Sequence, residues 1–66
     1  MKASKEELLK FLRNWRTAGE LRGAFGLEKP EAYMAELAAD GYDIKMEMRE
    51  LGQFRVASYR WTGIKN

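Results

Sequence analysis

The chain has 66 residues, of which 45% are hydrophobic and 33% charged, and it carries a net charge of +2 with neither cysteine nor histidine. These values predict a single small globular domain, residues 1–66, with an ordered core at about 4–62. They exclude a disulfide framework and any metal site built from Cys or His. No apolar run approaches the roughly 20 residues of a membrane span. We therefore expect an intracellular protein without metal or cofactor that is not an enzyme, because the commonest general base is missing.

The first predicted helix covers about residues 5–15. Ser4 and Glu7 have the spacing of a capping box, in which each side chain bonds the other residue's backbone N–H. Apolar residues then recur at i, i+3, i+4 and i+7, which places them on one helical face. We interpret this stripe as core; its members are Leu8, Phe11, Leu12 and Trp15.

A second capping box, Thr17 with Glu20, predicts the start of another helix, and Gly26 predicts its end. Gly23 weakens this helix by roughly 1 kcal/mol relative to alanine, and we expect it to allow a close approach of another helix. Residues 26–29 then form a short link to a third helix. Two short helices joined in this way are typical of a helix-turn-helix.

The third predicted helix covers residues 30–40. Pro30 suits its first position, because the missing N–H has no partner there. Met34, Leu37 and Ala38 are expected to face the core, and Gly41 can close the helix.

From residue 42 the apolar period changes to two, which predicts a β-hairpin over residues 43–61 with Gly52 in its turn. Residues 62–66 are expected to fray, and the four methionines are interpreted as core fillers. The predicted fold class is α+β: a winged helix-turn-helix with three helices followed by a C-terminal β-hairpin wing. A very short strand near residues 16–17 often completes such a sheet. The core face of the second hairpin strand is assigned to Ala57, Tyr59 and Trp61.

The chain resembles small winged helix-turn-helix domains encoded by bacteriophages and prophages. The resemblance rests on TAGEL at 17–21 with FGL at 25–27, ELAADGYDI at 36–44 and RVASYRW at 55–61. It implies double-stranded DNA binding with the third helix in the major groove. It also implies a transcriptional regulator, or an excision or recombination accessory factor, in the cytoplasm of a bacterial host. Such domains typically carry Arg or Lys where this chain has Tyr33, Ala38 and Ala39.

Candidate DNA contacts follow from this docking. The candidates for reading base edges lie at the start of the third helix: Lys29, Glu31 and Tyr33. The candidates for holding phosphates lie at the second helix and on the hairpin: Thr17, Arg22, Arg49, Gln53 and Arg55. We expect no catalytic and no metal-binding residues.

Charge is distributed unevenly, which leaves a second function open. Residues 28–42, including the proposed recognition helix, carry one cation and four acids, whereas the segments on either side are net positive. The alternative is a protein-interaction module of the same fold that has lost DNA binding. The expected partners are therefore duplex DNA, a second copy in a homodimer or cooperative array, or a host or phage protein. Contacts of the interaction module would be Ala35, Ala38, Ala39, Leu51 and Phe54.

Overall fold

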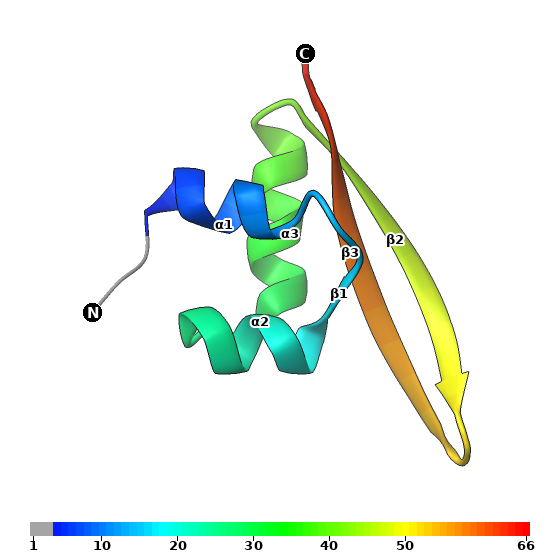
Figure 1. The fold of residues 1–66 in the computed structure, drawn as a ribbon. Coiled ribbons are helices and arrows are strands. Elements are labelled where there is room, and N and C mark those ends of the chain that lie inside the picture. Colours follow the sequence, from blue (N-terminus) through cyan, green and yellow to red (C-terminus); the bar gives the residue numbers. More distant parts are fainter. Residues whose placement is uncertain (1–3) are drawn as a thin grey trace.

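The computed structural model describes residues 4–66 as an α+β domain with three helices and a three-stranded antiparallel sheet. The strand order is β1-β3-β2, so β3 is central and β2 is an edge strand. The helices gather on one side of the sheet, and the β2–β3 hairpin projects beyond them (Figure 1). The predicted α+β class is confirmed. The elements are α1 (Lys5–Phe11), β1 (Arg16–Thr17), α2 (Ala18–Phe25), α3 (Pro30–Ala39), β2 (Tyr42–Leu51) and β3 (Phe54–Lys65).

Helix α1 is shorter than predicted, because it ends at Phe11 rather than near residue 15. Half of the predicted capping box is present at its start, where the Ser4 hydroxyl accepts a hydrogen bond from the Glu7 N–H, but no bond from the Ser4 N–H to the Glu7 carboxylate forms among the described residues. Its end is set by the sheet: the Leu12 carbonyl oxygen accepts from the Trp61 N–H at 2.7 Å. This bond gives the Leu12 carbonyl oxygen a partner in the sheet in place of the N–H of a further helical turn. Trp15 consequently lies outside the helix and is only half-buried.

Strand β1 and helix α2 follow directly. Arg16 pairs with Tyr59 of β3, which establishes the short strand that often completes such a sheet. Thr17 is both the last residue of β1 and the N-cap of α2, and the predicted capping box with Glu20 is complete. Gly26 ends α2 with a φ of 65°. A Cβ at Gly23 would have no atom within 4 Å, so the expected close helix approach at this residue is wrong.

Helix α3 begins at Pro30, as predicted, and buries Pro30, Met34 and Leu37. Ala38 is exposed, so its predicted place in the core is wrong. It lies about 100° round the helix from Leu37, which turns it away from the buried line. The buried hydrophobic core consists of Leu8, Leu9, Leu12, Leu21, Met34, Leu37 and Tyr59.

The β2–β3 hairpin runs further than predicted at its C-terminal end. Lys65 pairs with Tyr42, and the Asn66 N–H donates to the Gly41 carbonyl oxygen at 2.7 Å. The Trp61 indole N–H also donates to the Ile64 carbonyl oxygen at 2.9 Å. The expected fraying of residues 62–66 is therefore wrong.

Two methionines depart from the predicted core. Met46 and Met48 share the sheet face of Tyr59 and Ala57, which pair directly with them. Tyr59 is buried beneath the helices, but Met46 and Met48 are 62% and 54% exposed because they lie on the edge strand. Met34 is buried as expected, and Met1 lies outside the described residues.

Candidate nucleic-acid interface

An open groove of about 470 Å³ separates the first turn of α2 from the hairpin. One wall comes from β1 and α2, and the other comes from the two hairpin strands near their turn. We call it the α2–hairpin groove; its lining residues are Thr17, Ala18, Gly19, Arg22, Leu51, Arg55, Val56 and Ala57.

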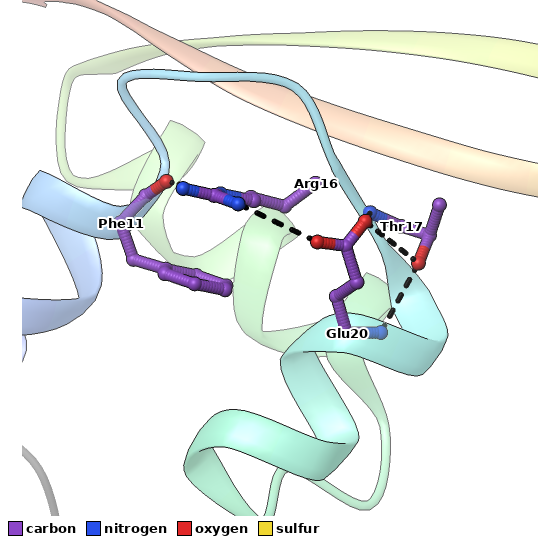
Figure 2. A network of polar contacts seen from close by, with 4 residues as sticks. All are labelled: Phe11, Arg16, Thr17 and Glu20. Carbon is purple, nitrogen blue, oxygen red and sulfur yellow. Dashed lines mark hydrogen bonds and ion pairs between the residues drawn. The ribbon is translucent and has the colours of Figure 1, made fainter.

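The α2 wall is fixed by a network of polar contacts (Figure 2). The Glu20 carboxylate accepts from the Thr17 N–H at 3.2 Å, and the Thr17 hydroxyl accepts from the Glu20 N–H at 3.1 Å. Arg16 extends this network to α1: its Nε donates to the Phe11 carbonyl oxygen at 2.9 Å, and its guanidinium lies 4.0 Å from the Phe11 ring centroid. The Thr17 hydroxyl is therefore occupied by the helix cap.

The polar groups that remain for a ligand in this wall are backbone N–H groups. Ala18 and Gly19 occupy the first turn of α2, where a helix offers its N–H groups no intrahelical acceptor. The helix dipole gives this end a partial positive charge. The Glu20 carboxylate repels an anion in the groove only weakly, because it accepts a hydrogen bond from Thr17 and lies 3.5 Å from Arg16 Nη1.

Two arginines bring full positive charge to the α2–hairpin groove. Arg22 projects from α2 and is exposed, and Arg55 projects from β3 with a side chain 76% exposed. Arg55 lies 3.8 Å from Glu50, but both side chains are open to solvent. Ion pairs of this kind contribute little, so a phosphate can replace the carboxylate.

The other hairpin candidates are placed differently. Arg49 is opposite Val56 and Glu50 is opposite Arg55, so Arg49 and Arg55 extend from opposite faces of the sheet. Arg49 lies 3.8 Å from Glu47 and 6.0 Å from the Trp15 ring centroid. Arg49 does not line the groove. Gln53 does not line it either, and it is exposed in the turn of the hairpin.

The three base-reading candidates do not form one surface. Lys29 is exposed at the N-cap of α3, where its side chain makes no capping hydrogen bond. Glu31 and Tyr33 are two residues apart, which separates them by about 200° round the helix. Tyr33 is half-buried against the core. Glu31 is exposed on the side near Tyr59, where burial first and the Glu31 charge second raise the pKa of the Tyr59 hydroxyl.

The outer side of α3 is short of cations. Ala32, Ala35 and Ala39 are exposed on the side away from the buried Met34 and Leu37. Asp40 is directed towards α1, where its carboxylate lies 3.7 Å from Lys5 Nζ. One of the four acids of this segment is thus paired away from the outer side of the helix.

Sequence reasoning missed Val56 and Ala57 as residues of a binding groove, and it named Leu51 only as a contact of the interaction module. These three residues form the apolar part of the α2–hairpin groove. Neither strand period nor composition identifies these residues, because the groove exists only where β1 ends beside β3. Among residues 4–66 there is no group of three or more acidic residues placed to hold a metal ion, and no helix long and apolar enough to cross a membrane.

Comparison with protein-family models, with curated proteins and with solved structures gives no match for this chain.

Proposed function

We propose that the chain is a winged helix-turn-helix domain that binds duplex DNA, with the phosphate backbone of one strand lying in the α2–hairpin groove. One observation carries this proposal. Arg22 and Arg55 come from distant parts of the sequence, yet both line the groove beside the first turn of α2. Two guanidinium groups and the free amide N–H groups of the first turn of α2, all from residues that line one groove, are donors suited to phosphate.

In this docking, α3 enters the major groove by its N-terminal half. Lys29 then reaches a guanine and Glu31 accepts from a cytosine amino group, whereas Tyr33, half-buried and about 200° round the helix from Glu31, makes no base contact in this docking. The alanines on the outer side of α3 contribute shape but no hydrogen bonds. Phosphate contacts therefore supply most of the affinity, which makes binding strongly dependent on salt.

A cellular role follows from the resemblance to phage and prophage domains. We place the chain among small transcriptional regulators or excision accessory factors in the bacterial cytoplasm, rather than among enzymes. Such a small interface gives limited specificity, so we expect two or more copies on each DNA site.

The test is an NMR titration of the ¹⁵N-labelled protein with a mixed-sequence duplex at two salt concentrations. We expect shifts at residues 17–22, 29–33 and 51–57 that weaken as salt rises. No shifts at low salt, where even non-specific binding appears, would contradict DNA binding. Shifts confined to the outer sheet face around Arg49 would contradict the docking while leaving DNA binding in place.

A second candidate function is the protein-interaction module. It is favoured by the hairpin's exposed apolar side chains, of which Phe54 is 73% and Leu51 is 59% exposed. Scattered exposed apolar residues are common, but a cluster on one projecting hairpin marks an interaction surface. The same NMR titration separates the two functions, because an interaction module gives no salt-dependent shifts with DNA.

A further inference from the structure

Strand β2 has a free edge. It pairs with β3 on one side only, and no other element in the described part of the chain lies along its other side (Figure 1). It is ten residues long, so its free edge presents a row of unpaired backbone N–H and C=O groups. Such an edge is a template for pairing with another strand.

The side chains of β2 alternate in a way that protects the edge poorly. Ile44, Met46 and Met48 lie on the face towards the helices, and both methionines are more than half exposed. Lys45, Glu47 and Arg49 lie on the other face. A strand whose charges all have one sign repels a second copy of itself, but this strand alternates positive and negative charges, so a second copy can place opposite charges across the interface.

We propose that two copies of this chain associate through β2, antiparallel, with Met46 of one copy facing Met46 of the other on a two-fold axis. In this register Lys45 faces Glu47 of the second copy, and symmetry repeats the pair. Ile44 faces Met48 on the helix side, which covers both exposed methionines. The two sheets then form one continuous sheet.

The neighbouring registers fit less well. Residues directly opposite each other in an antiparallel pair point to the same face of the sheet. The two-fold axis must therefore pass through a residue of β2, because an axis between two residues would pair residues from different faces. A register centred on Glu47 places the Glu47 side chains of the two copies opposite each other and Lys45 opposite Arg49, so like charges repel in each pair. Centring on Met48 gives the Glu47–Arg49 pair but sets Met46 against Glu50. A register centred on Ile44 also pairs opposite charges, Asp43 with Lys45, but it pairs fewer residues and leaves Met48 beyond the paired segment. The Met46 register joins opposite charges on one face and also covers both exposed methionines on the other.

The existing ion pairs of β2 do not oppose this pairing. Lys45 lies 3.5 Å from Asp43, and Arg49 lies 3.8 Å from Glu47, within one strand. The side chains of Lys45 and Glu47 are 59% and 51% exposed, so both remain free to reach across the new interface. The opposite edge of the sheet is only the two-residue β1, so pairing through β2 ends at a dimer.

The test exchanges the two charges that face each other. Lys45→Glu and Glu47→Lys each set like charges opposite each other, and we expect each to raise the dimer dissociation constant by about tenfold or more. The double variant Lys45→Glu/Glu47→Lys restores the attraction, and so does an equimolar mixture of the two single variants, which should form a heterodimer. Lys10→Glu is the matched control for Lys45→Glu, because it makes the same charge change on α1. Sedimentation velocity from micromolar to millimolar protein measures all five samples beside the unaltered chain.

Each outcome decides the proposal. Dimers of the unaltered chain, loss in each single variant and recovery in the mixture support it, and recovery also shows that the variants fold. An unaltered chain that stays monomeric at millimolar concentration would overturn it. A dimer weakened by Glu47→Lys but not by Lys45→Glu would overturn the Met46 register in favour of the Met48 register. Because no DNA is present, the result is independent of the proposed function.

Discussion

The backbone N–H of Trp61 donates a 2.7 Å hydrogen bond to the carbonyl oxygen of Leu12. This bond joins the end of α1 to the central strand of the sheet. A second bond joins the neighbouring residues: Nε of the Arg60 guanidinium donates to the Arg13 carbonyl oxygen at 3.1 Å. The two bonds turn the chain from α1 into β1, and β1 in turn positions the first turn of α2 beside the hairpin. The α2–hairpin groove therefore depends on contacts outside it.

Arg16 links α1, β1 and α2, and we expect Arg16→Ala to destabilise the fold. It would remove the hydrogen bond to the Phe11 carbonyl oxygen, the contact with the Phe11 ring and the ion pair with Glu20. The expected loss is about 1–2 kcal/mol of unfolding free energy, measured by urea denaturation. Lys10→Ala, on the exposed side of α1, is the control and should change stability by less than about 0.5 kcal/mol. Equal effects of the two substitutions would contradict the role given to Arg16.

Glu20 makes stability depend on pH in the acid range. The Thr17 N–H first, with help from the Thr17 hydroxyl and Arg16, lowers the pKa of the Glu20 carboxyl below its usual 4.5. Because the folded-state pKa is the lower one, the carboxylate stabilises the fold above pH 4.5 and the stabilisation is lost as pH falls below that value. We expect Glu20→Gln to be less stable than the unaltered chain at neutral pH, with the difference shrinking in acid. Urea denaturation across this pH range measures it, and a pH-independent difference would contradict the account.

Substitution by alanine at Gly41 and at Gly23 should change the stability of the fold in opposite directions. Gly41 has a φ of 99°, and an added Cβ would collide with the Asn66 carbonyl oxygen. Gly41→Ala should therefore destabilise the fold and speed hydrogen exchange at Asn66. Gly23 lies within α2 with open space around it, so Gly23→Ala should stabilise by about 0.5–1 kcal/mol. Thermal denaturation of both variants tests the pair, and a shift in the same direction for both would contradict it.

Lys29 and Arg55 should differ in what they contribute to DNA binding. Lys29→Ala should relax the preference for particular base pairs, because this residue lies at the end of α3 that we place in the major groove. Arg55→Ala should weaken binding about equally on all sequences, since it lines the phosphate site. Selection from a randomised duplex library with each variant measures the preference. Unchanged selectivity in Lys29→Ala would contradict the orientation of α3.

Local signals in the sequence predict much of this fold. The Thr17–Glu20 capping box, Pro30 and the two-residue period of the hairpin each depend on neighbours in the chain, and each is confirmed. The end of α1 could not be predicted in this way. It is set by hydrogen bonds from Arg60 and Trp61, almost fifty residues later, which outweigh the helical period that includes Trp15.

The candidate site was predictable only in part, for a related reason. Arg22 and Arg55 could be named as cations on the expected elements, but their convergence depends on where β1 ends. Arg49 and Arg55 look equivalent in the sequence, and the strand register places them on opposite faces. Met46 and Met48 follow the apolar period of a buried face, yet edge position leaves them exposed.

The most direct test of the proposed function compares arginine substitutions that carry the same charge change. Arg22→Gln and Arg55→Gln alter the α2–hairpin groove, and Arg49→Gln alters the opposite sheet face of the same hairpin. Fluorescence anisotropy with a labelled duplex over a range of salt concentrations gives the affinity and its salt slope. We expect Arg22→Gln and Arg55→Gln each to weaken binding and reduce the slope by about 1, and Arg49→Gln to leave the slope unchanged. Equal losses in all three variants, or a loss in Arg49→Gln alone, would contradict phosphate binding in the groove.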